Sequence, residues 1–158
     1  QVANFASSMA EKLRKQRSVS GEMVVFAYTN RFKETQPQTY LNALISFTTP
    51  TSDQRTIVSR AVSATKLMFK NGYGYKKAGV IASKIIPEGE VMHSLFEDTA
   101  ATEREHKITS TLDAINSTFG KGTIKLAVQG SGKIKTASDN QSPHYTTKWS
   151  DLPKVSVK

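Results

Sequence analysis

The stretch "GEMVVFAYTN" at residues 21–30 decides how the first half of the chain folds. It is rich in β-branched and aromatic residues and ends in a turn-forming Asn, which is typical of a β-strand. The residues before it, 2–16, repeat apolar side chains at spacings of three and four, as an amphipathic helix does. The apolar residues of this predicted helix are Val2, Phe5, Met9 and Leu13.

A second strand, a helix and a third strand are predicted further along the chain. Residues 40–48, "YLNALISFT", alternate between apolar and polar positions and indicate a strand. Thr51 and Gln54 are spaced as a capping box, so a helix is predicted to start at Thr51 and to end at the Asn-Gly pair 71–72. Residues 75–86, "YKKAGVIASKII", indicate the third strand.

The remainder of the chain changes character. Residues 87–101 are acidic and hold Pro and Gly, as a linker does. Thr102 and Glu105 form a second capping box, so a helix is predicted over 103–119. "TIKLAVQ" at 123–129 alternates and predicts a short strand.

This order of elements predicts an α+β fold: an antiparallel sheet with two helices packed on one face, followed by a small helix-strand C-terminal extension. The predicted parts are a sheet domain at 1–86, a linker at 87–101 and the extension at 102–158. The other face of the sheet would stay open. Open faces of this kind serve as platforms for nucleic acid or for protein partners.

The formal net charge of +9 is distributed unevenly along the 158 residues. Residues 1–86 carry +9, residues 87–113 carry −5 and residues 120–158 carry +5. A basic surface attracts polyanions, because neutralised phosphates release condensed counterions. The alternative is a solvated basic surface that keeps the protein soluble, and charge alone does not decide between the two.

The chain has no cysteine, so it forms no disulfide and no thiolate zinc site. No apolar run approaches the length of about 20 residues that crosses a bilayer, and no signal peptide is visible. We therefore expect a cytoplasmic location and no membrane partner.

No catalytic or metal-binding residues are predicted in the chain. The histidines His93, His106 and His144 form no zinc motif. "GSGK" at 130–133 lacks the leading Gly and the final Ser or Thr of a phosphate loop. The acidic residues of 88–105 are interpreted as a solvated linker and as charges near a helix N terminus, rather than as a metal dyad.

Five motifs follow one another in a specific order. They are "FASSMAEKLRKQ" (5–16), "YKKAGVIASKIIPEG" (75–89), "LFED" (95–98), "GKGTIKLAVQG" (120–130) and "SPHYTTKWSDLP" (142–153). This series resembles the C-terminal part of UmuC-like proteins, which are Y-family translesion DNA polymerases of the DNA polymerase V type. The resemblance covers nearly the whole chain, and its last two motifs are the most specific.

The resemblance implies that residues 1–86 form a little finger, the domain with which Y-family polymerases hold DNA. The palm with its carboxylates and Mg²⁺ would lie upstream, so this chain is expected to need no cofactor and not to polymerise by itself. The first strand of the little finger, which precedes the helix at 2–16 in that family, is expected to be missing. "GTIKLAVQ" at 122–129, from the same chain or from a second copy, could then complete the sheet. The alternative is that this strand belongs to a separate tail unit that caps the helix at 103–119, and that the sheet edge is covered by association between chains. Swapping or edge association predicts self-association, with a fragment that is not monomeric.

The resemblance also implies which residues contact damaged primer-template DNA. Lys76 and Lys77 match a basic pair that the family places on the template backbone, and Arg31 and Lys33 could reach the same groove. Consecutive strand residues point to opposite faces, so only one of Lys76 and Lys77 can face DNA squarely. The alternative is a set of solvated lysines that discourage edge-to-edge aggregation.

A short clamp-binding peptide is expected in the linker, as in UmuC-like proteins. Leu95 and Phe96 match its apolar pair, whereas Met92 stands where the family has Gln. The alternative is that Leu95 and Phe96 only dock the linker onto the fold. The sliding clamp is thus an expected partner, and the family adds a UmuD-like subunit and the recombinase filament, which no residue here identifies.

The tail holds Tyr145 and Trp149 on either side of Lys148. Such rings can stack on bases, but we expect them to cover the helix at 103–119, because a lone amphipathic helix needs a partner. The leading hypothesis is a non-catalytic, DNA-gripping and partner-docking part of an error-prone translesion polymerase active in SOS mutagenesis. The alternative is a free-standing basic adaptor that binds nucleic acid or protein.

Overall fold

The computed structural model describes the backbone of residues 1–33, 35–92, 99–130 and 142–152, and their side chains except at 99–103. The elements are α1 (Val2–Lys15), β1 (Ser18–Thr29), β2 (Tyr40–Thr51), α2 (Gln54–Met68), β3 (Tyr75–Pro87), η1 (Glu88–Glu90), α3 (Thr99–Phe119), η2 (Ala127–Gln129) and η3 (Trp149–Asp151), where η marks a 3-10 helix. None of the described helices is long and apolar enough to cross a membrane.

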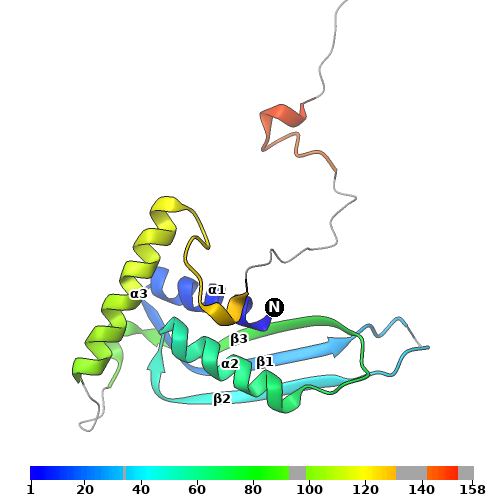
Figure 1. Cartoon of the computed structure of the whole chain (residues 1–158), viewed down its shortest axis with the longest axis horizontal. Helices are drawn as coiled ribbons and strands as arrows, with labels where there is room; N and C mark the ends of the chain where they lie inside the picture. Colours follow the sequence, from blue (N-terminus) through cyan, green and yellow to red (C-terminus); the bar gives the residue numbers. More distant parts are fainter. Residues whose placement is uncertain (34, 93–98, 131–141, 153–158) are drawn as a thin grey trace, which may run out of the picture.

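The central strand is β1, which pairs with β2 on one side and with β3 on the other, both antiparallel (Figure 1). Val25 lies opposite Ala43 on β2 and Val80 on β3. Side chains alternate between the faces of a strand, so the odd-numbered positions from Met23 to Thr29 point to one face and the even-numbered positions to the other. The predicted α+β fold with its antiparallel sheet is confirmed.

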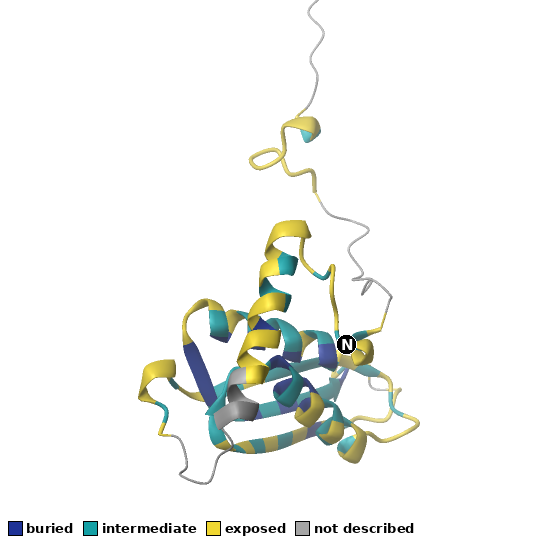
Figure 2. Cartoon of the chain, turned by 60° about the vertical axis from the view of Figure 1, so that its left-hand side comes forward, coloured by how far each residue is buried: buried dark blue, intermediate teal, exposed yellow. Residues whose placement is uncertain are grey.

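Helices α1 and α2 pack side by side on one face of the sheet (Figures 1 and 2). On α1 the buried positions are mostly small, which lets the helix approach the sheet closely. The core consists of Ala3, Ala6, Ala10 and Leu13 from α1, Met23 and Val25 from β1, and Ile57, Val58 and Ala61 from α2. Two helices on one face leave the other face of the sheet without a cover among the described residues.

The predicted N-terminal caps are wrong at both later helices. Thr51 ends β2, and the N-cap of α2 is Asp53, whose carboxylate accepts a hydrogen bond from the Thr56 N–H at 2.7 Å. A carboxylate is a stronger acceptor than a hydroxyl for the free N–H groups of a first turn. Helix α3 already begins at Thr99, so Thr102 lies inside it. The two alanines at 100–101 favour this extension, because Ala has the highest helix propensity.

The predicted end of α2 is also wrong. The helix ends at Met68, before the Asn-Gly pair 71–72. The Tyr75 hydroxyl lies 3.1 Å from Lys70 N and 3.2 Å from Lys70 O, so the backbone of Lys70 has partners outside the helix. Gly72 still adopts a positive φ of 85°, but in the turn that follows the helix.

The predicted strand at 123–129 is not a strand. Both backbone groups of Ile124 bond to the Asn116 side chain, and the Leu126 N–H donates to Gln129 Oε1 at 2.8 Å. Leu126 packs against the core, and Gln129 hydrogen-bonds to Asn4 on α1. The segment therefore does fold back onto the sheet domain, but through side chains and a 3-10 turn instead of a β-ladder (Figure 1).

The tail residues 142–152 form a compact turn that does not cover α3. Trp149 is 89% exposed and Tyr145 is more than half exposed, so the prediction that they shield the helix is wrong. The turn is stabilised by its own groups: Lys148 pairs with Asp151 at 3.0 Å, and their hydrogen bond lowers the pKa of the Asp151 carboxyl. On α3, Phe119 stays largely exposed.

Candidate nucleic-acid interface

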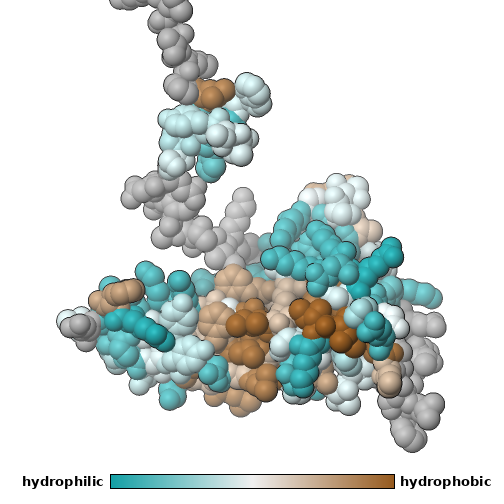
Figure 3. Space-filling model, turned by 180° about the vertical axis from the view of Figure 1, so that it is seen from behind, coloured by the Kyte–Doolittle hydropathy of each residue, from teal (hydrophilic) through white to brown (hydrophobic). Residues whose placement is uncertain are grey.

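The open face of the sheet is formed by the even-numbered residues of β1 and their neighbours. Val24 lies in register between Leu44 on β2 and Ile81 on β3. Leu44 and Ile81 are largely exposed, and so is Ile85 further along β3. Figure 3 shows this face with a hydrophobic patch at its centre and hydrophilic side chains toward both ends. We refer to this surface as the open face.

Three aromatic rings lie next to one another on the open face. The rings of Phe26 and Tyr28 lie within 16° of parallel, with their centroids 6.1 Å apart, and the Tyr28 and Tyr40 centroids are 6.2 Å apart. The tip of the Phe26 ring occupies the space above Gly79, where a Cβ atom would lie only 2.5 Å from Phe26 Cζ. The glycine therefore lets the ring lean onto β3. We call Phe26, Tyr28 and Tyr40 the aromatic row.

Lys77 flanks the aromatic row. Lys77 on β3 lies opposite Tyr28 on β1, and Tyr28 lies opposite Tyr40 on β2. The three residues therefore form one line across the sheet. Lys76 is the extra residue of a β-bulge, because the register passes from Tyr28 opposite Lys77 to Thr29 opposite Tyr75, so strand alternation does not assign its side chain to a face. Both lysines are exposed. Both lysines lie at the start of β3, and the register places Lys77 in line with the aromatic row.

The loop between β1 and β2 brings two more cations to the same end of the sheet. Arg31 and Lys33 are exposed and follow directly after β1. The Gln38 side chain donates hydrogen bonds to the carbonyls of Asn30, Lys33 and Gln36, which fixes the loop near the strand end. All four predicted DNA-binding residues are thus exposed at the same end of the sheet, and their contact with DNA stays a prediction.

The sequence interpretation missed the aromatic row and two further cations. Lys66 and Lys70 lie on the last turn of α2 and just beyond it, at the same end of the sheet as the start of β3. The signal for the rings was available in "GEMVVFAYTN", because an alternating strand places Phe26 and Tyr28 on the same face. Tyr40 could only be assigned once the strand register was known.

The predicted clamp-binding residues are only partly described. Met92 follows η1 and is 92% exposed. Leu95 and Phe96 lie outside the described residues, as does His93. Their proposed role therefore stays a prediction.

A polar groove of about 840 Å³ runs between α1, α3 and the segment after α3. Two of its cations are paired with Glu11, which lies 2.8 Å from Lys15 Nζ and 3.7 Å from Lys121 Nζ. The hydrogen bond from Lys15 holds the pKa of Glu11 below its usual value, so the carboxylate is ionised at neutral pH. Because these lysines already have a counter-charge, the groove is less suited to phosphates than the open face.

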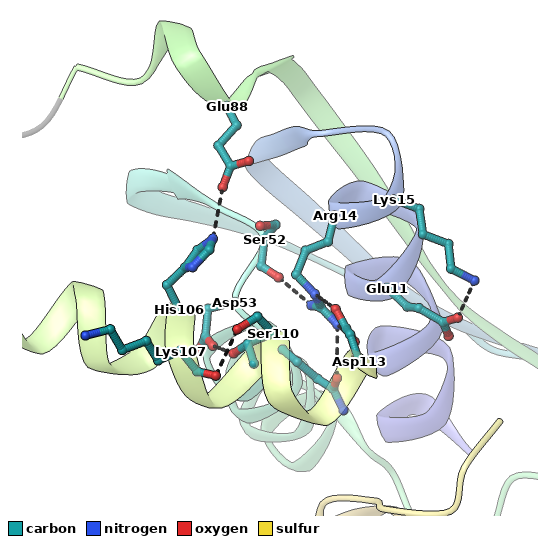
Figure 4. A network of polar contacts seen from close by, with 12 residues as sticks. Glu11, Arg14, Lys15, Ser52, Asp53, Glu88, His106, Lys107, Ser110 and Asp113 are labelled. Atoms are coloured by element: carbon teal, nitrogen blue, oxygen red, sulfur yellow. Dashed lines mark hydrogen bonds and ion pairs between the residues drawn. The ribbon is translucent and has the colours of Figure 1, made fainter. Parts of the chain in front are cut away.

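Helix α3 is docked onto the sheet domain by polar contacts around Arg14 (Figure 4). The guanidinium holds both carboxylate oxygens of Asp113, at 2.6 and 2.8 Å, and also donates to the Ser52 carbonyl at 2.8 Å. The Arg14 side chain is only 14% exposed and that of Asp113 is 35% exposed. Bidentate pairs of this kind are geometrically specific, so they fix the position of α3.

Further contacts extend this docking along α3. The buried Thr109 donates its hydroxyl to Asp53, the same residue that caps α2, at 3.1 Å. Arg55 Nη2 lies 3.0 Å from Glu105 Oε1 as an ion pair, without the alignment of a hydrogen bond. His106 lies 3.9 Å from Glu88, a contact that is an ion pair only when the imidazole is protonated.

The described residues hold no cluster of His, Asp and Glu side chains suited to a metal ion. The fold is a two-layer α+β platform. Its core lies on one side of the sheet, and the aromatic row with Lys77 beside it lies on the other. Surfaces of this composition are typical of proteins that bind nucleic acids.

The chain belongs to the family described as the impB/mucB/samB family C-terminal domain, whose model matches residues 1–95. A second model, a domain of unknown function (DUF4113), matches residues 106–155. The first match contains the whole sheet with α1 and α2, and the second contains most of α3 and the tail. The predicted boundaries at 86 and 101 are not tested and stay a prediction.

The chain is similar over almost its whole length to "Protein UmuC" of Salmonella typhimurium, with 34% identity over 98% of this chain and 37% of that protein. "Protein ImpB" of Salmonella typhimurium is 33% identical over 96% of the chain and 36% of its own length. "DNA polymerase IV" of Desulfatibacillum aliphaticivorans is 29% identical over 52% of the chain and 21% of its own length. The chain thus spans little more than a third of the length of the UmuC and ImpB proteins, and the predicted resemblance to the C-terminal region of UmuC-like proteins is confirmed.

Proposed function

We propose that this chain is the DNA-gripping and partner-docking C-terminal part of an error-prone translesion DNA polymerase that acts in the SOS response. The observation that carries the proposal is that Lys77 lies on the open face and that Arg31 and Lys33 are exposed at the same end of the sheet. Family membership favours this function over a free-standing adaptor. In this proposal the catalytic groups and Mg²⁺ belong to other parts of the polymerase, and this chain supplies binding in the cytoplasm.

The grip acts through backbone phosphates. Three exposed cations near one strand end can follow a phosphate backbone, and lysine and arginine contacts to phosphate position DNA without selecting a sequence. Such indifference to sequence suits a polymerase that works on damaged templates. Lys66 and Lys70 add positive charge at the same end of the sheet.

Replacing Arg31, Lys33 and Lys77 together with Ala should weaken binding to primer-template DNA and flatten its salt dependence. Each lost phosphate contact lowers the slope of log K against log salt by about 0.9, so the slope should fall by nearly 3. Fluorescence anisotropy of a labelled primer-template, titrated with the 158-residue chain at several NaCl concentrations, measures both quantities.

A matched control removes three exposed cations from the helices: Lys12, Arg60 and Lys107, each replaced with Ala. This variant has the same net charge as the test variant but an intact open face, so its slope should change little. Equal slopes for the test and control variants would contradict the proposed interface.

The linker docks the sliding clamp in this proposal, with Leu95 and Phe96 as an apolar plug. Replacing both with Ala should abolish clamp binding, and Met92→Gln should strengthen it by restoring the amide of the family motif. Surface plasmon resonance against the immobilised clamp measures both effects. Clamp binding that is indifferent to all three changes would assign the docking to another segment. A UmuD-like subunit and the recombinase filament are further proposed partners, on family grounds alone.

A further inference from the structure

We infer that the aromatic row of Phe26, Tyr28 and Tyr40 stacks the unpaired bases of single-stranded nucleic acid. This inference rests on the proposed function, because it assumes that the open face meets nucleic acid. It adds a second kind of contact and a different ligand: bases that have left the duplex, held by their faces instead of by their phosphates.

The rings are arranged as a platform, since they are neighbours on the surface of the sheet and not part of the core. The Phe26 ring leans over Gly79, and the Tyr28 ring lies within 16° of parallel to it. Tyr40 extends the row onto the edge strand and is 54% exposed. Aromatic side chains displayed next to positive charge on an open sheet are a common solution for holding single strands.

The spacing of the rings favours unpaired bases over a duplex. Bases within a duplex stack on one another with a rise of about 3.4 Å and present only their edges in the grooves. The ring centroids of the aromatic row are 6.1 and 6.2 Å apart, so stacked neighbours in a duplex do not match them. Bases that have separated from one another can each lay a flat side of the base on a ring.

The charges beside the row fit the backbone of the same ligand. Lys77 lies in line with Tyr28 and Tyr40, and the Arg31 and Lys33 loop follows directly after β1. A strand that lays its bases on the rings would therefore have cations within reach of its phosphates. A second copy of this chain is a poorer occupant, because it would bring the same positive groups against these cations.

Two probes with equal numbers of phosphates separate stacking from phosphate binding. A short oligothymidine carries bases, whereas an abasic oligomer of the same length carries only the sugar-phosphate backbone. We expect the 158-residue chain to bind the oligothymidine more tightly at every salt concentration, by fivefold or more for each stacked base on the order-of-magnitude scale of base–aromatic stacking.

The variant Tyr28→Leu with Tyr40→Leu keeps only the Phe26 ring, so it should lose most of this preference while its affinity for the abasic oligomer stays unchanged. The single variant Tyr40→Leu changes only an exposed residue of an edge strand, so it should stay folded and lose part of the preference. Leu44→Ala is the matched control, because it removes an exposed apolar side chain from the same face without removing a ring. It should keep the full preference.

Each possible result of these experiments leads to a different conclusion. Equal affinity of the unmodified chain for both probes would overturn the stacking inference but leave the phosphate grip standing. Binding to neither probe, nor to primer-template DNA, would overturn both. Sedimentation that shows a dimer, dispersed by Tyr40→Leu, would assign the aromatic row to contact between copies and would also overturn the inference.

Discussion

Ile57→Ala should lower the free energy of unfolding by about 3 kcal/mol, which is a large part of the stability of a small domain. Ile57 is fully buried on α2 and belongs to the cluster that joins both helices to β1. The smaller side chain loses its transfer free energy and leaves a cavity, which the packed alanines of α1 cannot fill. Urea denaturation followed by circular dichroism should show a lower midpoint with an unchanged slope.

Leu67→Ala is the matched control for this substitution. Leu67 lies on the same helix and is 89% exposed, so its loss should change the stability by no more than about 0.5 kcal/mol. Comparable losses for both variants would mean that α2 does not pack as described. Because the core lies on only one face of the sheet, its integrity also determines whether the open face is displayed at all.

Asp113→Ala should release α3 from the sheet domain at a cost of about 2 kcal/mol, because it leaves the mostly buried Arg14 guanidinium without its carboxylate. Arg14→Ala should have an effect of similar size, and the double variant should cost less than the sum of the two. The difference is the coupling energy of the pair. Hydrogen exchange of the α3 amides, compared with those of β1, reports the release directly.

The ion pair of Lys15 with Glu11 is the control for this set of single and double variants. Lys15 is 74% exposed, and exposed ion pairs contribute only about 0–1 kcal/mol, so Lys15→Ala should leave the exchange of α3 nearly unchanged. Additive effects of Arg14→Ala and Asp113→Ala would show that the two side chains act independently, contrary to the bidentate contact.

The fold of residues 2–87 could be predicted because its signals are periodic and local. β-Branched and aromatic residues identified β1, alternation identified β2, and the spacing of Phe5, Met9 and Leu13 identified α1. The end of α2 was missed because it depends on a tertiary contact, the hydroxyl of Tyr75 on the backbone of Lys70. A pattern within one segment carries no information about such partners.

The segment 123–129 alternates as a strand does, but a strand also needs a neighbouring strand whose backbone it can pair with, and alternation does not show whether one is available. Here the Asn116 side chain satisfies both backbone groups of Ile124, so a ladder is not needed. For the candidate site, the residue types that attract phosphate were visible in the sequence. That Lys77 lies in line with Tyr28, and that Tyr40 adjoins Tyr28, follow only from the register.

The docking of α3 also limits how far the proposed clamp peptide can extend. Eight residues separate the end of η1 at Glu90 from the start of α3 at Thr99. The Glu88 N–H of η1 donates to the Arg17 carbonyl at 3.0 Å, and Thr109 of α3 donates to Asp53, so both elements are anchored to the sheet domain. A chain of this length spans at most about 30 Å, so its middle can project no more than about 15 Å while both ends are held. A clamp that binds there must come almost into contact with the sheet domain. In the proposed complex, release of α3 would lengthen the connection to the sheet domain, so that a bound clamp could lie further from that domain.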